Sequence, residues 1–388
     1  MTTTAPIEVP RGLAGVVVTD TELGDVRGRE GFYHYRQYSA IELAESRTFE
    51  DVWHLMFFGS LPDAAEREAF VRQTAQLRRL PAEMRDVLPD VARTTAKSGP
   101  LAGLRSALSL LGAHAGLRPV YDLDADECQA DAMLICAAVP TLLTALHRLS
   151  QGLEPIDPRD DLPYAANYLY MLTGTEPDAE RARAVEQYMI STIDHGFNAS
   201  TFTGRVIAST GADVAACLVG AIGALSGPLH GGAPSRALDT LDAIGTEDNI
   251  DPWIRDRVLA GDRIMGFGHA VYRTEDPRSR MLRGIAQQLA GTAEERALVE
   301  FAVQVERRVL EILAELKPSR ELHTNVEFYA GVVMELCGLP RAMFTPTFAS
   351  GRVVGWSANI LEQANDSKII RPAARYTGPP PPEPVPSV

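Results

Sequence analysis

Helical patterns occupy almost the whole chain between residues 39 and 365 and leave little room for a sheet. Ser39-Ala40-Ile41-Glu42 and Asp63-Ala64-Ala65-Glu66 each place a capping side chain three residues before a glutamate, which is typical of a helix start. Thr48 is a third predicted N-cap, and Gly59 can end the helix that follows it. We therefore predict a mostly α-helical fold.

Two further segments refine this prediction. Residues from about Asp126 to Leu149 are apolar on most faces, which indicates a helix buried in the core, with a kink expected at Pro140. Strand-like alternation is limited to Gly15–Thr19 and Phe32–Tyr38, which we expect to form a small N-terminal β-hairpin around Gly28 and Gly31.

Composition narrows the class of protein. A chain of 388 residues that is 45% hydrophobic can bury a large core in two or three domains. The net charge of −14 argues against nucleic-acid binding, which needs a basic face. Positive charge is instead concentrated in one short stretch, at Arg273, Arg278, Arg280 and Arg283. This stretch fits an anion-binding site, although a solvated charge cluster at a helix start has the same composition.

Targeting, redox and metal signals are weak. The cysteines Cys128, Cys136, Cys217 and Cys337 lie in apolar contexts without metal-type spacing, so we expect buried free thiols, no metal site and a reducing cytoplasm. We see no signal peptide and no run of about 18 uncharged apolar residues, and we expect no membrane span. The proline-rich residues 379–388 are predicted to be disordered.

Three segments carry the residues of acid–base chemistry. Gly266–Arg278 places His269 directly after two glycines and before two arginines. Gly227–Gly232 places His230 on a loop near a helix start, where a neutral imidazole can donate to a carbonyl. The third segment, Asn325–Gly331, supplies the carboxylate of Glu327. Each motif alone is weak, and His230 on its own also fits a structural histidine that caps a turn.

Together, and in this order, these segments resemble the citrate synthase family. The likeness extends to Arg11–Val16, Thr48–Trp53, Asp194–Thr201 and Phe348–Pro372, and so covers nearly the whole chain. The resemblance implies a large helical domain formed by residues 1–235 and 339–378. It also implies a smaller helical domain, residues 236–338, that closes over the active site.

The resemblance also implies a reaction and its catalytic residues. The chain would join acetyl-CoA to oxaloacetate in a Claisen-type condensation that gives citrate and free CoA. Glu327 would abstract the methyl proton, His230 would stabilise the enol, and His269 would polarise the keto group of oxaloacetate. No tightly bound cofactor is expected, because the coenzyme A thioester is a co-substrate.

Substrate binding is assigned by the same resemblance. His195, Arg278, Arg352 and Arg371 match the family's oxaloacetate-binding residues, although His195 on its own also fits a helix histidine paired with a carboxylate. Arg371 matches the residue that enters from a neighbouring subunit, which implies a homodimer with shared sites. Arg273 resembles the region that contacts the phosphates of coenzyme A.

One departure keeps alternatives open. The family usually has aspartate where this chain has Glu327, which adds one methylene, about 1.5 Å of reach. A misplacement of about 1 Å can cost on the order of a hundredfold in rate. The alternatives are a 2-methylcitrate synthase that uses propionyl-CoA and a catalytically weak protein that binds CoA or a dicarboxylate.

Overall fold

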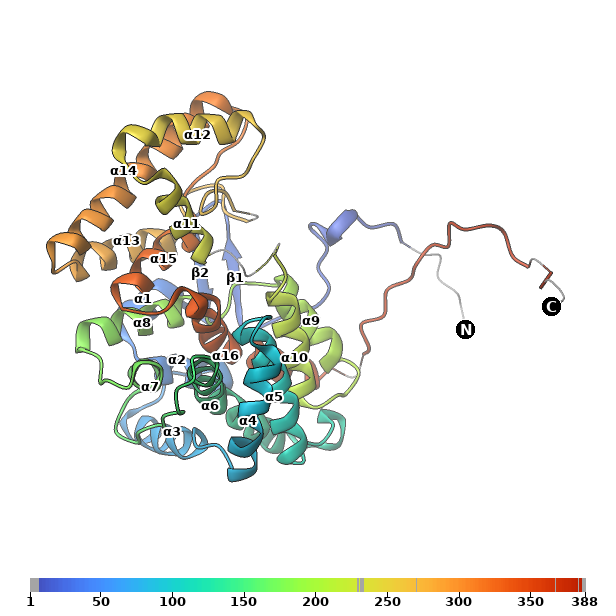
Figure 1. The fold of residues 1–388 in the computed structure, drawn as a ribbon. Coiled ribbons are helices and arrows are strands. Elements are labelled where there is room, and N and C mark those ends of the chain that lie inside the picture. The colour runs from blue at the N-terminus through green and yellow to red at the C-terminus, as the bar shows by residue number, and fades with distance from the viewer. Residues whose placement is uncertain are drawn as a thin grey trace.

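The computed structural model describes residues 7–228, 230, 234–269, 271–366, 368–382 and 384–385 (Figure 1). The first ten helices in this part of the chain are α1 (Ala40–Ser46), α2 (Phe49–Phe58), α3 (Ala64–Leu77), α4 (Ala82–Thr95), α5 (Pro100–His114), α6 (Ala125–Ser150), α7 (Tyr164–Thr173), α8 (Ala179–Ser191), α9 (Ala199–Ala208) and α10 (Val214–Leu225). They are followed by α11 (Pro234–Ile244), α12 (Ile250–Leu259), α13 (Pro277–Leu289), α14 (Ala293–Leu316), α15 (Val326–Leu336) and α16 (Phe344–Ala364). The prediction of a mostly α-helical fold is confirmed.

The small N-terminal sheet differs from its prediction in one strand. Strands β1 (Gly24–Arg27), β2 (Phe32–Tyr35) and β3 (Tyr38–Ser39) form an antiparallel sheet in the order β1-β2-β3, with Gly24 opposite Tyr35. The predicted turn around Gly28 and Gly31 is confirmed, but the prediction of a strand at Gly15–Thr19 was wrong. Because the turn is short, residues 24–27 are the ones that pair with β2. Residues 15–19 instead lie on a segment that extends away from the helices (Figure 1).

The predicted helix starts are confirmed by their hydrogen bonds. Ser39 Oγ accepts from the Glu42 backbone N–H, and both Thr48 and Asp63 form complete capping boxes. Gly59 ends α2 in the left-handed region, at φ 82°. These caps satisfy backbone groups that the helix itself leaves unpaired.

Helix α6 forms the centre of the core and contacts α3, α4, α5, α7 and α16. It is a single helix that continues through Pro140. Among the described helices it is the one long and apolar enough to cross a membrane, but 78% of its most apolar window is buried inside the protein. All four cysteines are buried free thiols, as predicted.

Helices α11 to α15 lie at one end of the molecule, where α12 packs on α14 and α13 packs on α15 (Figure 1). Both α13 and α15 also contact α8, and α11 contacts α16. The division into two domains at residues 236 and 338, with closure of the smaller one, stays a prediction.

The C-terminal segment leaves the packed helices after α16 and contains no helix or strand in its described residues (Figure 1). Arg375 on this segment forms an ion pair with Glu8 on the N-terminal segment. Glu383 and residues 386–388 of the predicted disordered tail lie outside the described residues. Disorder of the tail stays a prediction.

Helix α16 packs against the backbone that precedes His195 with almost no free space. A Cβ atom on Gly355 would lie 1.8 Å from the Ile193 carbonyl oxygen and 3.3 Å from the Asp194 Cα. Backbone atoms cannot move aside as a flexible side chain can. Glycine at position 355 therefore sets how closely α16 approaches the loop that carries His195.

We expect Gly355→Ala to lower the free energy of unfolding by about 3 kcal/mol or more, because the added methyl group forces α16 and this loop apart. Thermal and denaturant unfolding will measure the loss. Gly284→Ala is the matched control, because a Cβ at this position in α13 meets nothing within 4 Å. The control should be unchanged or more stable by up to about 1 kcal/mol. Equal melting temperatures for the two variants would contradict the close packing.

Candidate active site

Two short segments that are far apart in sequence pair with each other. Their pairing brings the loop that contains Gly266 and Gly268 next to the start of α15. Phe267 forms a β-bridge with Thr324. The Gly268 N–H donates to the His323 carbonyl over 2.7 Å, and the Asn325 N–H donates to the Gly266 carbonyl over 2.9 Å. Gly266 and Gly268 have φ values of +88° and +87°, which other residues rarely adopt. The pairing joins the segment that carries His269 to the start of α15, which carries Glu327.

His269 is held as a neutral donor. Its Nδ1 accepts from the backbone N–H groups of Val271 and Tyr272, over 3.0 and 3.1 Å. A nitrogen that accepts two hydrogen bonds carries no proton, so in the neutral ring the proton is on Nε2. Burial, followed by the charge of Arg278, lowers the pKa of His269 to about 4. The Nε2–H can therefore donate to a carbonyl oxygen at neutral pH.

His195 lies next to His269, with 5.4 Å between the ring centroids. Its Nε2 is 2.9 Å from the Tyr272 hydroxyl, and burial holds its pKa well below the usual value. The neighbouring Asp194 carboxylate instead accepts from the Gly196 N–H and from Asn359. Pairing of His195 with a carboxylate, the alternative left open by the sequence, is not seen among the described residues.

Arg278 is buried in an ion pair. Its Nε and Nη2 donate to the two oxygens of Asp276 over 3.0 and 2.8 Å. The guanidinium lies between the rings of Tyr33 and Tyr272, 5.8 and 5.9 Å from their centroids. Burial disfavours its charge, but Asp276 more than compensates and raises the pKa of Arg278. Its Nη2 is also 3.5 Å from His269 Nε2. The N–H groups of the two side chains are therefore close enough to donate to the same ligand.

Arg352 approaches this cluster from α16. It is 2% exposed, its Nε donates to the Thr192 carbonyl over 2.5 Å, and its guanidinium stacks on Phe348 at 4.6 Å. Within the described residues it forms no ion pair with a carboxylate, and burial lowers its pKa. An arginine that is buried without a carboxylate partner is suited to bind an anionic group.

His230 lies in the turn between α10 and α11. Its Nε2 is 2.9 Å from Ser200 Oγ, and the Trp356 indole N–H donates to the same oxygen over 3.1 Å. Ser200 Oγ is also 2.7 Å from Asn198 Oδ1. Because this amide oxygen can only accept, the Ser200 hydroxyl donates its proton to it. His230 therefore donates from Nε2 in this arrangement. Its pKa is lowered by burial and by Arg352, and the adjacent Gly231 and Gly232 lie outside the described residues.

Glu327 is the second residue of α15 and has its N–H capped by Asn325. Its Oε2 is enclosed and accepts no hydrogen bond within the described residues. Burial raises the pKa of Glu327 to about 7, although Arg278 opposes this shift. A carboxylate that titrates near neutrality is suited to act as a general base.

Two predicted binding residues are exposed. Arg273 contacts the cluster through its Nη1, which donates to the carbonyls of His269 and Tyr272 over 3.2 Å. Arg371 is exposed on the C-terminal segment and makes no contact with the cluster in the single chain. The other predicted residues form one cluster around the two buried arginines, linked by the contacts and charge interactions described above, and are His195, His230, His269, Arg278, Glu327 and Arg352.

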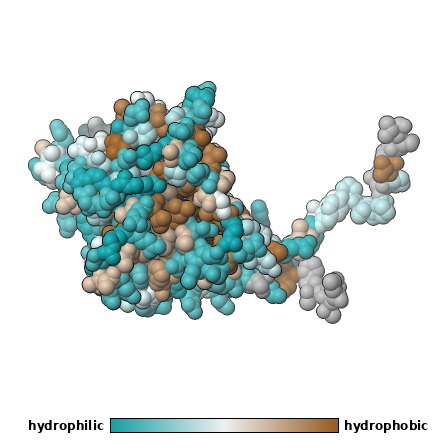
Figure 2. All heavy atoms as spheres, turned by 90° about the horizontal axis from the view of Figure 1, so that it is seen from below, coloured by the Kyte–Doolittle hydropathy of each residue, from teal (hydrophilic) through white to brown (hydrophobic). Residues whose placement is uncertain are grey.

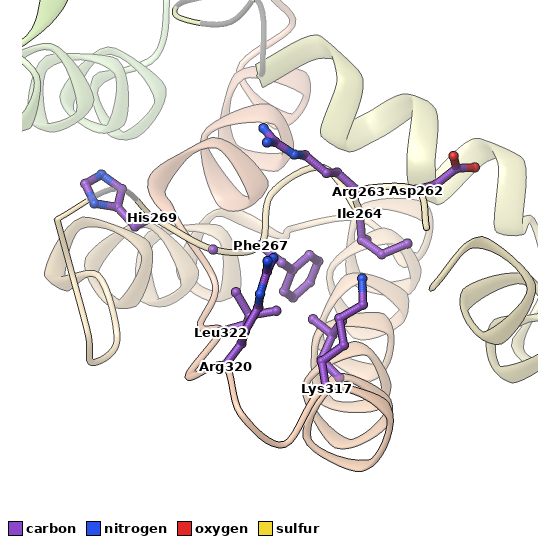
Figure 3. A pocket seen from close by; sticks show the side chains of 10 residues that line it. Asp262, Arg263, Ile264, Phe267, His269, Lys317, Arg320 and Leu322 are labelled. Carbon is purple, nitrogen blue, oxygen red and sulfur yellow. The ribbon is translucent and has the colours of Figure 1, made fainter. Parts of the chain in front are cut away.

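A pocket of about 350 Å³ opens beside His269 and contains cationic residues that the sequence patterns did not reveal (Figure 3). Arg263, Lys317 and Arg320 line it together with apolar residues such as Ile264 and Leu322. Lys317 and Arg320 lie in the loop between α14 and α15, whereas Arg263 lies in the loop after α12, so no single motif indicates all three. No group of three or more potential metal ligands occurs within the part of the chain that the structure describes.

The sequence and the fold match those of known proteins. Residues 12–373 match the family described as citrate synthase, C-terminal domain. A citrate synthase from Synechocystis sp. is 37% identical over 367 residues, which cover 95% of this chain and 90% of the relative. Citrate synthase 2 from Bacillus subtilis is 36% identical over 374 residues, which cover 95% and 96%. The chain belongs to the citrate synthase family, and it is an enzyme of the transferase type.

Solved structures agree with this assignment. The crystal structure of citrate synthase from Thermotoga maritima matches with a TM-score of 0.84 at 34% identity, over 98% of both chains. Citrate synthase from Thermoplasma acidophilum, in a ternary complex with carboxymethyl coenzyme A and oxaloacetate, matches with a TM-score of 0.89 at 27% identity, again over 98% of both chains.

The hydrogen bonds of His269 predict its protonation state. At about pH 5.5, where an ordinary histidine is mostly protonated, His269 should be neutral with its proton on Nε2. Nitrogen-15 NMR of the imidazole will show this, with the His269→Gln variant to assign the signals. Because the folded pKa is depressed, neutral His269 should favour folding fully above about pH 6.5, and this contribution should fall as the pH drops towards 4. A protonated Nδ1 at pH 5.5 would contradict the assignment.

Proposed function

We propose that the protein condenses acetyl-CoA with oxaloacetate to give citrate and CoA. The observation that carries this proposal is that one cluster around Arg278 holds both the Glu327 carboxylate, whose pKa burial raises to about 7, and the His269 Nε2–H donor. A Claisen condensation needs a base for the methyl proton of one substrate and a donor for the carbonyl oxygen of the other. The Thermoplasma acidophilum relative was solved with a CoA derivative and oxaloacetate together.

The condensation starts with proton abstraction by Glu327. Burial makes this carboxylate more basic than an exposed glutamate, and Arg278 and Arg352 keep a large fraction of it ionised at neutral pH. The resulting enol is stabilised by a hydrogen bond from His230. For Nδ1 of a neutral His230 to donate, the Ser200 hydroxyl turns from Asn198 towards Nε2, and Asn198 Oδ1 keeps its bonds from the Ser200 and Thr201 N–H groups.

The enol carbon then attacks the keto carbon of oxaloacetate. His269 Nε2–H donates to the keto oxygen, where negative charge develops, so this bond strengthens in the transition state. Arg278 and Arg352 bind the carboxylates, and His195, positioned by Tyr272, adds a further neutral contact. Hydrolysis of the citryl thioester releases citrate and CoA.

The pocket beside His269 is suited to the coenzyme A moiety. Its cations can pair with phosphate groups, and its apolar residues can contact the adenine ring and the pantetheine chain (Figure 3). Arg273 does not line this pocket, and its Nη1 donates to the carbonyls of His269 and Tyr272. The pocket residues are therefore stronger candidates for phosphate binding than Arg273.

The protein is proposed to act as a cytoplasmic homodimer in which Arg371 completes the partner's site. The segment that carries Arg371 extends away from the helices and is exposed, together with Ile369 and Tyr376 at 62% and 70% (Figures 1 and 2). Apolar side chains on an extended segment gain from burial against another molecule. Helix α10 is almost wholly apolar yet leaves Val219 and Ala224 partly exposed, which gives a second copy a surface to cover.

Release of free thiol from acetyl-CoA in the presence of oxaloacetate tests the reaction. We expect oxaloacetate-dependent release by the wild type and loss of nearly all of it in Glu327→Gln, because an amide cannot accept the proton. If the wild type releases no thiol, the result would favour the alternative of a catalytically weak protein that binds CoA or a dicarboxylate. One methylene is worth about 1–3 kcal/mol of discrimination, so a higher kcat/KM for propionyl-CoA than for acetyl-CoA would favour the 2-methylcitrate alternative.

Glu327→Asp tests whether the site is built for the longer carboxylate. If it is, the shorter side chain stops short of the methyl group, and we expect kcat to fall by about a hundredfold. The KM for oxaloacetate should change little, because Glu327 does not bind it. A tenfold rise in kcat, about 1.4 kcal/mol of barrier, would show that glutamate is a handicap in this site.

Mixed dimers test the shared site. Arg371→Ala and His230→Ala proteins should each be inactive. In a hybrid, one of the two sites combines an intact His230 with an intact Arg371 from the partner, so we expect about half the wild-type activity per hybrid dimer. Hybrids separated by distinct affinity tags make the comparison direct. Inactive hybrids would contradict the contribution of Arg371 in trans.

A further inference from the structure

Tyr272 contacts three of the residues proposed to bind oxaloacetate, and it does so through three different groups. Its hydroxyl is 2.9 Å from His195 Nε2, and its backbone N–H donates to His269 Nδ1 over 3.1 Å. The guanidinium of Arg278 lies over its ring, 5.9 Å from the centroid. The Tyr272 side chain is enclosed, since the residue is 2% exposed. Removing the hydroxyl alone therefore leaves two of these three contacts in place.

The hydroxyl of Tyr272 donates to His195 rather than accepting from it. A phenol hydroxyl has one proton to donate, and within the described residues His195 Nε2 is the only hydrogen-bond partner of this hydroxyl. If Nε2 were the donor, the hydroxyl proton would be enclosed without an acceptor, which is unfavourable. Burial raises the pKa of Tyr272, although Arg278 opposes this shift, so the hydroxyl keeps its proton at neutral pH.

The proton of His195 is therefore on Nδ1. Burial holds the pKa of His195 well below the usual value, so at neutral pH its ring carries a single proton. Because Nε2 accepts from Tyr272, that proton is on the other nitrogen. His269 is the reverse case, since its Nδ1 accepts from two backbone N–H groups and its Nε2 carries the proton. The two rings are 5.4 Å apart and nearly perpendicular, at 83°.

We propose that Tyr272 is a positioning residue that holds the protons of His195 and His269 on opposite nitrogens, through its hydroxyl and its backbone N–H. The proposal rests on the proposed binding of oxaloacetate at these histidines. Each ring has one N–H to donate, while its other nitrogen already accepts from Tyr272. Neither ring offers a lone pair to a ligand. This arrangement suits the keto and carboxylate oxygens of oxaloacetate, because these oxygens can only accept.

Nitrogen-15 NMR of the imidazoles at neutral pH tests the proton positions directly. In the wild type we expect His195 to carry its proton on Nδ1, with the His195→Gln variant to assign its signals. Tyr272→Phe removes the hydroxyl and keeps the backbone N–H. In this variant the form of His195 with its proton on Nε2 should become populated, whereas His269 should keep its proton on Nε2.

Tyr33→Phe is the matched control for loss of a nearby hydroxyl. The Tyr33 ring is 5.3 Å from the His195 ring and also faces Arg278, but its hydroxyl donates to the Ser191 carbonyl. Removing that hydroxyl should leave the proton of His195 on Nδ1. The spectrum of the wild type decides the position of this proton even if one of the two phenylalanine variants is unstable.

Calorimetric titration with oxaloacetate alone measures the consequence for binding. In Tyr272→Phe only a fraction of His195 carries its proton on Nδ1. Because the affinity falls with that fraction, we expect the Kd of oxaloacetate to rise about fivefold or more. The KM for acetyl-CoA should be unchanged, since this hydroxyl contacts only His195. The NMR measurement needs no turnover, so a wild type that releases no thiol would contradict the proposed function while the proton positions are still decided.

A proton on Nε2 of His195 in the wild type would overturn the proposal. The same holds if the His195 proton stays on Nδ1 in Tyr272→Phe, or if Tyr33→Phe moves it as much as Tyr272→Phe does. An unchanged Kd of oxaloacetate in Tyr272→Phe would also overturn it, because the proton position would then have no part in binding.

Discussion

The Asp276 carboxylate is the contact on which the geometry of this site depends. It is 1% exposed and caps the start of α13, where it accepts from the Arg278 backbone N–H. The same two oxygens bind the Arg278 guanidinium and accept from the Val326 N–H at the start of α15. One buried charge therefore fixes an arginine and two helix N-termini. Removing one partner of such a pair leaves the other charge buried and unpaired, at a cost of about 3–5 kcal/mol.

The electrostatics of the cleft follow from that arrangement. Arg278 is compensated by Asp276, whereas Arg352 is buried without an ion-pair partner among the described residues. Burial, together with the charges of these two arginines, keeps His195, His230 and His269 neutral. Neutral histidines can donate to a carbonyl without adding repulsion between cations. The same burial raises the pKa of Glu327, against the charges of Arg278 and Arg352, so burial sets the pKa of both the base and the donors.

Much of the fold was predictable because its signals are local. Helix periodicity, the caps at Thr48 and Asp63 and the apolar run of α6 each depend on neighbours in sequence. The first strand was misplaced because strand pairing depends on a partner, and β1 is selected by the turn that joins it to β2. The candidate site residues were found through short motifs around His230, His269 and Glu327. The residues that orient them were missed, since Ser200, Trp356 and Tyr272 carry no motif that links them to a histidine.

The sequence by itself determined the helical architecture, the family and the identities of the candidate catalytic side chains, because each is encoded within a few consecutive residues. Only the tertiary structure decided which nitrogen of His269 carries the proton, and that among the described residues Arg278 is paired with a carboxylate whereas Arg352 is not. The contacts of His269 and Arg278 are with neighbours in sequence, but they form only in the folded loop, which the pairing of Phe267 with Thr324 holds in place. Burial strengthens those interactions by excluding water, and burial exists only once the helices have packed.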